Sequence, residues 1–104
     1  MILINTDKVT GKEITEELGI ARGSTIRARN VGRDIFAAFK NLAGGEIKSY
    51  TKLMADAREQ AMQRMIQDGE KLGADAIINI RYTTSQVMQG AAEILAYGTA
   101  VKLK

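Results

Sequence analysis

A single long helical pattern restricts the folds that this 104-residue chain can adopt. From Ser49 to Leu72, apolar side chains recur at helical spacing on one side, and charged or amide side chains lie opposite. The apolar stripe consists of Tyr50, Leu53, Met54, Ala57, Ala61, Met65 and Leu72, with Met62 and Ile66 on its flank. A helix of this length spans about 35 Å, roughly the diameter of a compact domain of this size. One subunit can therefore barely cover the apolar side, so a second surface is expected to bury the flank.

The limits of this helix are predicted from the residue types at its ends. Ser49 is a plausible N-cap, because its hydroxyl can accept a hydrogen bond from the first turn. Gly73 follows the last turn, where glycine commonly ends a helix. Before this helix, the segment from Asp34 to Gly44 predicts a shorter helix with Ile35, Phe36, Phe39 and Leu42 on one side.

Segments with strand character lie on both sides of the two helices. Residues 2–5 form a short apolar run, and turn residues Asp7 and Gly11 follow it. Residues 24–30 alternate, with Ser24, Ile26 and Ala28 on one face and Thr25, Arg27 and Arg29 on the other. After the long helix, residues 74–84 predict a strand with Ile78, Ile80 and Tyr82 facing one way, followed by a loop over residues 86–90.

The closing segment, residues 93–103, alternates large and small side chains. Leu95, Tyr97, Thr99, Val101 and Leu103 take one face, and Ala96, Gly98 and Ala100 take the other. A small face indicates close approach by another element, most simply the long helix. Strands at both ends with two consecutive helices between them predict a single α+β domain, residues 1–104, whose mainly antiparallel sheet packs against one long helix and one shorter helix.

The composition excludes several kinds of chemistry. The chain has neither cysteine nor histidine, so thiolate nucleophiles, disulfides, cysteine-based metal sites and an imidazole base are all ruled out. We assign no catalytic or cofactor-binding residue from the sequence. The N-terminal residues lack the pattern of a signal peptide, and no apolar run reaches membrane-spanning length, which predicts a cytoplasmic protein with no membrane partner.

Four segments in order carry a resemblance: "IFAAFKNLAGGEIKSY", "DAREQAM", "LGADAIINIRY" and the terminal "AYGTAVKL". They resemble the YbjQ-like family of small bacterial and archaeal proteins, over residues 6–104. The resemblance implies a dodecin-like subunit assembled as a ring of five, in a family that carries a heavy-metal-binding label. The positions that match the family pattern are Gly44, Gly45, Tyr50, Ala57, Arg58, Gly73, Ala74, Ala76, Tyr97, Gly98, Thr99 and Ala100. A chain without histidine or cysteine departs from that label, so the metal remains unknown, and we predict no tight binding of a soft metal.

The candidate ligand contacts are Glu46, Tyr50, Arg58 and Glu93. Glu46 and Glu93 are carboxylates beside structured elements, where a solvated surface or an ion pair is the alternative. Arg58 lies beside the apolar stripe and within a matched segment. Arg64 precedes Asp68 by four residues, a spacing that predicts an ion pair.

Two further patterns have a structural interpretation and a functional one. The pair Gly44–Gly45 ends the shorter helix, or it provides an anion site before the long one; the helix end is favoured. Met54, Met62 and Met65 offer thioethers to a soft cation or fill the core; packing is favoured.

Basic residues gather around the strand at residues 24–30, and the net charge is +3. The cluster consists of Arg22, Arg27, Arg29 and Arg33, with Arg81 on a neighbouring strand. Sheets that bind nucleic acid usually add stacking aromatic side chains, and only Tyr82 is expected nearby, on the opposite face. Nucleic-acid binding is therefore disfavoured.

Three functions remain open at this point. The first is a non-enzymatic homo-oligomeric binding or scaffold protein, a pentamer by resemblance, that takes a small ligand or metal between subunits and uses Met62 and Ile66 at its interface. The second is an enzyme that uses carboxylates, with a hard metal such as Mg²⁺. The third is a weak nucleic-acid binder that uses the arginine-rich strand.

Overall fold

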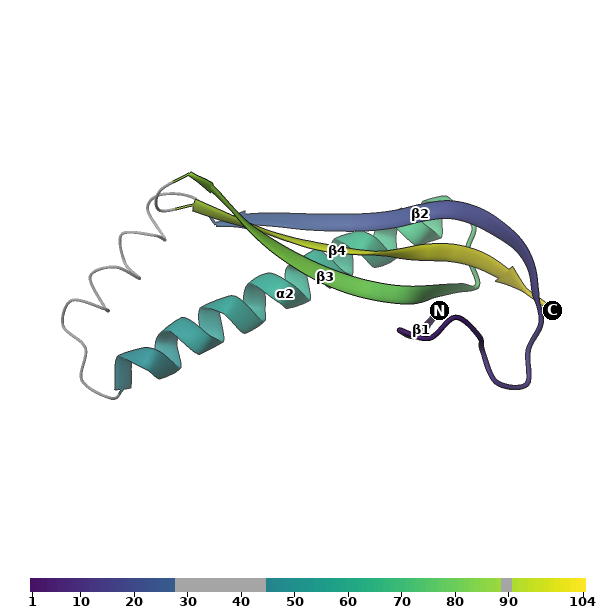
Figure 1. Ribbon diagram of the computed structural model, residues 1–104, viewed down its shortest axis with the longest axis horizontal. Coiled ribbons are helices and arrows are strands. Elements are labelled where there is room, and N and C mark those ends of the chain that lie inside the picture. The colour runs from purple at the N-terminus through teal and green to yellow at the C-terminus, as the bar shows by residue number, and fades with distance from the viewer. Residues whose placement is uncertain (28–44, 89–90) are drawn as a thin grey trace.

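Four strands and one helix make up the described part of this computed structural model, which comprises residues 1–27, 45–88 and 91–104. The elements are β1 (Ile2–Leu3), β2 (Ile14–Arg27), α2 (Gly45–Lys71), β3 (Ala76–Met88) and β4 (Ala91–Leu103). The strands form one sheet in the order β1-β3-β4-β2, in which β1 pairs with β3 in parallel and the other pairs are antiparallel. Helix α2 runs obliquely across one face of this sheet (Figure 1). The predicted α+β class with a mainly antiparallel sheet is confirmed, whereas the shorter helix predicted over residues 34–44 lies outside the described residues.

Helix α2 begins earlier than predicted and ends where predicted. It starts at Gly45, so Ser49 lies inside the helix and the predicted N-cap is wrong. An acidic side chain is favourable in a first turn, and the sequence offers one at Glu46. At the other end, the amide of Ala74 donates to the carbonyl of Gly69 at 3.0 Å and that of Gly73 donates to Glu70 at 3.0 Å. These bonds form a Schellman motif, which the positive φ of 82° at Gly73 permits.

We call the sheet face that packs against α2 the inner face and the opposite face the outer face. Small side chains line the inner face and allow α2 to lie close to it. The buried cluster between them contains Ala21, Ala57, Ala61, Met65, Ile77, Ile80, Ile94, Ala96 and Ala100. At Gly23 a side chain would have no room, because an added Cβ would overlap the backbone of Ala61 and Met65 and lie 2.6 Å from the carbonyl carbon of Arg64. The predicted contact between the small face of residues 93–103 and the long helix is confirmed.

The middle of the apolar stripe on α2 is buried as predicted. Ala57, Ala61 and Met65 are fully buried, and Met54 packs against them. Leu72 does not belong to this core: it follows the last helical residue and is 39% exposed. The side chains of Tyr50 and Leu53 lie outside the described residues.

Strand β3 carries an irregularity that the sequence pattern did not reveal. Its pairing with β4 shifts register between Ile78 and Arg81, and Asn79 adopts a positive φ of 54°. As a result, Ile77 and Ile80 join the inner cluster, whereas Ile78 joins a second cluster on the outer face. The prediction that Ile78, Ile80 and Tyr82 face the same way is therefore wrong for Ile78, because a bulge reverses the alternation. The strand also extends to Met88, into the loop predicted over residues 86–90.

Strand β2 begins ten residues before its predicted start at Ser24 and ends at Arg27. Register shifts between Ile14 and Glu16 and between Glu17 and Gly19 interrupt its alternation, which concealed the first half of the strand. The predicted separation of Thr25 from Ser24 and Ile26 is confirmed. Thr25 is buried against α2, although it is polar, whereas Ile26 is 57% exposed on the outer face.

Side chains of α2 bond along the free edge of β2. The carboxylate of Asp68 accepts a hydrogen bond from the amide of Arg22 at 2.9 Å, and the guanidinium of Arg64 donates to the carbonyl of Ser24 at 2.6 Å. The predicted ion pair between Arg64 and Asp68 is wrong, because both side chains bind the backbone of β2 instead. Edge strands whose polar groups are occupied in this way resist pairing with other chains.

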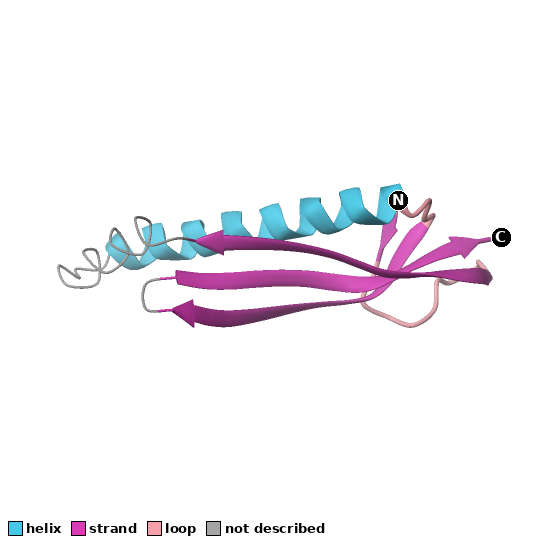
Figure 2. Cartoon of the chain, turned by 90° about the horizontal axis from the view of Figure 1, so that it is seen from above, coloured by secondary structure: helices cyan, strands magenta, loops and turns pink. Residues whose placement is uncertain are grey.

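The N-terminal segment covers one end of the outer face. Ala76, Ile78 and Val101 are buried there, beneath Ile2, Ile4, Val9, Ile14 and Leu103. The rest of the outer face is not covered by any described element, and α2 lies along the opposite side of the strands (Figure 2). The sheet is therefore packed on its inner face and largely open on its outer face.

The chain is elongated. Its dimensions are 54 × 24 × 16 Å, and its radius of gyration is 16.8 Å, compared with about 13 Å for a compact domain of this length. The inner core is accordingly thin, with α2 as its only described cover. No described helix is long and apolar enough to cross a membrane.

Candidate functional site

The structure does not bring the predicted ligand contacts together. Arg58 is exposed on α2, on the inner side of the sheet. Glu93 lies on the outer face, because it pairs with Ile26 of β2 and Ser85 of β3, and Ile26 faces outward. Glu46 and Tyr50 belong to the first two turns of α2, and their side chains lie outside the described residues. Arg58 and Glu93 are therefore on opposite faces and cannot share one ligand within a subunit.

Arg58 has a different neighbour, the phenol of Tyr82 on β3. Burial raises the pKa of Tyr82 above its ordinary value of 10.0, the charge of Glu59 raises it further, and the charge of Arg58 lowers it. The hydroxyl is thus electrostatically coupled to two charged residues of α2. Because Tyr82 pairs with Ala96 of β4, which is buried on the inner face, Tyr82 faces the helix side of the sheet.

Met62 and Ile66 occupy the flank of α2, beside the buried Met65. Met62 is half-buried and packs against the inner cluster, and Met65 is fully buried within it. Ile66 is also half-buried but is not among the side chains packed against that cluster. The interpretation of the methionines as core residues is confirmed for Met65, and Met54 and Met62 pack against the same core.

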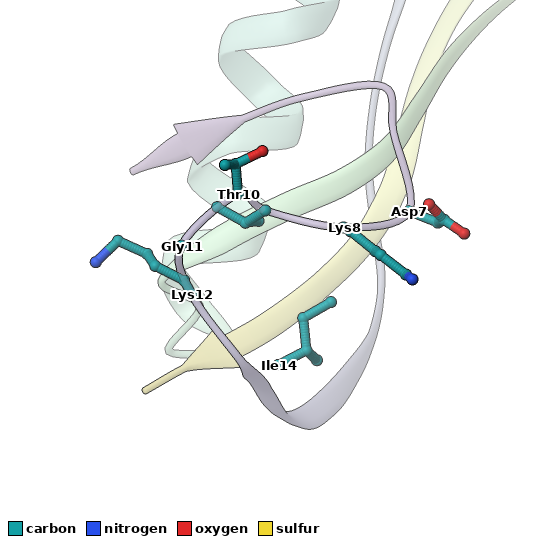
Figure 3. A pocket seen from close by; sticks show the side chains of 7 residues that line it. Asp7, Lys8, Thr10, Gly11, Lys12 and Ile14 are labelled. Carbon is teal, nitrogen blue, oxygen red and sulfur yellow. The ribbon is translucent and has the colours of Figure 1, made fainter.

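A pocket of about 550 Å³ lies at the end of the sheet where the N-terminal segment folds back (Figure 3). It is lined by Asp7, Lys8, Val9, Thr10, Gly11, Lys12 and Ile14. Lys8 and Lys12 extend in opposite directions from the loop (Figure 3). Ligand sites generally combine a hollow with polar groups that converge on it. This pocket has the hollow, but its charged groups diverge.

The outer face carries a row of three residues that the sequence did not reveal as a group. Tyr97 of β4 pairs directly with Arg22 of β2 on one side and with Arg81 of β3 on the other. Directly paired residues in an antiparallel sheet project to the same face, so the tyrosine lies between two arginines. The alternation of residues 93–103 places Tyr97 on the large face, but the partners follow only from the register.

These features define the class of the protein: a small α+β domain in which one long helix packs on a largely antiparallel sheet. The whole chain, residues 1–104, matches a family model described as "Putative heavy-metal-binding". A UPF0145 protein from Halorubrum lacusprofundi is 61% identical over 104 residues, which cover all of both chains. One from Methanosarcina acetivorans is 56% identical over 103 residues, covering 99% of this chain and 97% of the relative. The chain belongs to this YbjQ-like, UPF0145 family.

A solved structure shares the fold. The crystal structure of a protein of unknown function of the DUF74 family, from Pediococcus pentosaceus, superimposes with a TM-score of 0.67. The match covers 100% of this chain and 98% of the other, at 18% sequence identity. At that identity the likeness concerns the architecture of the sheet and helix.

The donor groups of this chain do not fit the heavy metal that the family description names. Soft metals prefer thiolate and imidazole ligands, and the sequence contains neither cysteine nor histidine. Among the described side chains, no three acidic residues lie close enough together to hold a metal ion. The thioether of Met65 is enclosed in the core. We therefore derive no chemistry through a metal at this site.

Proposed function

We propose that the chain is one subunit of a non-enzymatic homo-oligomeric binding protein, most simply a ring of five, with a small ligand held between subunits. The number five comes from the family resemblance. The observation that carries the proposal is an apolar strip along the side of α2 that faces β3, where the helix does not cover the sheet. The strip consists of Met1, Met62, Ile66 and Tyr82, of which Met1 is 47% and Tyr82 45% exposed.

The members of the strip lie beside successive turns of the helix. Tyr82 interacts electrostatically with Arg58 and Glu59 one turn before Met62. Towards the other end, the Cε of Met1 lies 3.6 Å from the position that a Cβ on Gly69 would occupy. Obligate interfaces between identical subunits are apolar, and burial of a side chain the size of Met or Ile contributes roughly 1.5–3 kcal/mol. A closed ring repeats that contribution at every interface.

The elongated shape supports the same proposal. A radius of gyration well above that of a compact domain means that one subunit buries less apolar surface than its length allows. Association along the strip would bury part of the remainder. Arg58, at the border of the strip beside Tyr82, is the charged residue best placed to contact a ligand held between subunits.

Light scattering at micromolar protein concentration tests the assembly, and native mass spectrometry of gently purified protein reports the subunit number and any retained small molecule. We expect a stable oligomer for the wild-type protein. A clean monomer mass would overturn the proposal.

The interface is tested by charge. Ile66→Glu should lower the assembly state or the melting temperature far more than Gln63→Glu, which introduces the same charge on the exposed side of α2. Ile66 is a sharper probe than Met62, because Met62 also packs against the core of its own subunit. If Met62→Glu and Ile66→Glu both keep the wild-type mass and melting temperature, the strip is not the interface.

A further inference from the structure

We propose that the open part of the outer face binds single-stranded nucleic acid, with Tyr97 stacking on a base and Arg22 and Arg81 contacting phosphates. The proposal rests on the row in which Tyr97 lies directly between the two arginines. It does not depend on the subunit number. It reverses the expectation from sequence, which found no aromatic residue on the same face as the arginines.

All three side chains of the row are accessible. Tyr97 is 37% exposed, and Arg22 and Arg81 are both exposed. Neighbouring strands are about 4.8 Å apart, so the two arginines flank the phenol ring at roughly 10 Å from each other. This spacing allows one base to lie on the ring while the adjoining phosphates reach the guanidinium groups.

The backbone and side-chain contacts of the two arginines hold the row in place. The guanidinium of Arg81 donates from one nitrogen to the carbonyls of Asn5 and Ile80, both at 3.0 Å. A guanidinium has five donors, so the remaining N–H groups can bind an anion. The amide of Arg22 is bound by Asp68, which fixes the strand that carries this side chain.

Apolar side chains extend the surface on both sides of the row. Ile20, which pairs with Thr99, is 65% exposed, and Ile26, which pairs with Glu93, lies beyond the next row. The intervening row, Ser24–Leu95–Thr83, carries no charge. Glu93 is four residues from Tyr97 on β4, or about 13 Å along the strand, and its carboxylate would repel a phosphate there. The favourable region is therefore centred on Tyr97.

The chemistry of this surface selects single strands over duplexes. A flat sheet face cannot enter a groove, but unstacked bases can lie on an exposed aromatic ring while cationic side chains bind the backbone. Stacking on Tyr97 and phosphate contacts from Arg22 and Arg81 do not distinguish one base from another, so we expect little sequence preference. With two phosphate contacts per subunit, binding should be weak and should fall steeply with salt. An oligomer would multiply the contacts.

The aromatic contact is tested by fluorescence anisotropy with a fluorescein-labelled oligouridylate at low salt. Tyr97→Ala should weaken binding about tenfold, the usual range for the loss of one stacked base, whereas Tyr97→Phe should retain it. The control is Leu72→Ala, which removes an apolar side chain of nearly the same exposure, 39%, at the end of α2. This control should bind as the wild type does.

The phosphate contacts are tested by the salt dependence. Arg22→Gln should reduce the slope of log affinity against log salt by about 0.7, the contribution of one phosphate contact on a single strand. Lys52→Gln removes the same charge from the exposed side of α2, and it should leave the slope unchanged. A labelled duplex of the same length should bind more weakly than the single strand.

Three results would overturn this inference: no binding of the oligouridylate by the wild-type protein at low salt, equal weakening by Tyr97→Ala and Leu72→Ala, or equal slopes for Arg22→Gln and Lys52→Gln. Native mass spectrometry of the same samples adds a fourth. If Tyr97→Ala changes the subunit number, the outer face is an interface between copies rather than a nucleic-acid surface. The oligomer itself is judged on the wild-type mass, so the two proposals fail separately.

Discussion

The inner and outer faces of the sheet are built from alternate residues of the same strands, yet they serve different ends. On the inner face, Gly23 and Ala96 are small enough for the backbone of α2 to lie against them. On the outer face, the neighbouring residues Arg22 and Tyr97 are large, polar or aromatic, and no described element covers them. Substitutions at two adjacent residues of one strand are therefore expected to act differently: one disturbs the packing against α2, and the other changes only the exposed surface.

The largest difference between the faces should appear at Gly23. Gly23→Val would place side-chain atoms where the backbone of Ala61 and Met65 already lies, and backbone cannot move aside without displacing the helix. We expect a loss of about 3 kcal/mol or more in the free energy of unfolding, at the upper end of the range for overpacking. Denaturation in urea measures it.

The adjacent residue provides the matched control. Ser24→Val adds a β-branched side chain on the outer face, and the bond from Arg64 to Ser24 uses only the backbone carbonyl. Its stability should stay within about 0.5 kcal/mol of the wild type, as is usual for surface substitutions. Equal losses at Gly23 and Ser24 would mean that the inner face is not the packed one.

A smaller effect is expected at the edge where the two faces meet. Asp68→Ala removes the acceptor for the amide of Arg22 and should cost about 1 kcal/mol, the typical contribution of one hydrogen bond. Glu70→Ala removes an equal charge near the same end of α2 and is the control. If the two variants have the same melting temperature, the bond to the strand edge contributes nothing measurable.

Regular alternation made the inner face largely predictable from the sequence. The small residues Ala96 and Ala100 correctly indicated that the long helix lies against their face, whereas the space beside Gly98 is filled by Ile77 and Ile80 of β3. Gly73 correctly marked the end of the helix. The bulges were not predictable. At Asn79 of β3, a single residue in a left-handed conformation exchanges the sheet faces to which the preceding residues of the strand, 76–78, project. The first half of β2 was missed for the same reason.

The outer row could not have been predicted, because it depends on register. The sequence places Tyr97 on the large face of its strand and groups Arg22 with other basic residues, but it does not state which residues face one another across strands. Two register-determined pairs, Arg22 with Tyr97 and Tyr97 with Arg81, create the candidate surface. Among the predicted contacts, Arg58 gained a neighbour in Tyr82, which the sequence assigned to a different strand without indicating the contact.

The smallest predicted effect tests that contact on the inner side. Because burial raises the pKa of Tyr82 and Glu59 adds to the shift, Glu59→Gln should lower this pKa, and Arg58→Gln should raise it further. Ultraviolet titration of the phenol measures both shifts, in a background that carries Tyr50→Phe and Tyr97→Phe so that Tyr82 is the only remaining tyrosine. Because its pKa is raised, the folded state holds the phenolic proton of Tyr82 more tightly than the unfolded chain does. The free energy of unfolding should therefore fall as pH rises through 10.0 and above. If neither substitution moves the pKa of Tyr82, α2 does not lie beside β3 at this point. Tyr82 then does not belong to the strip proposed for the interface.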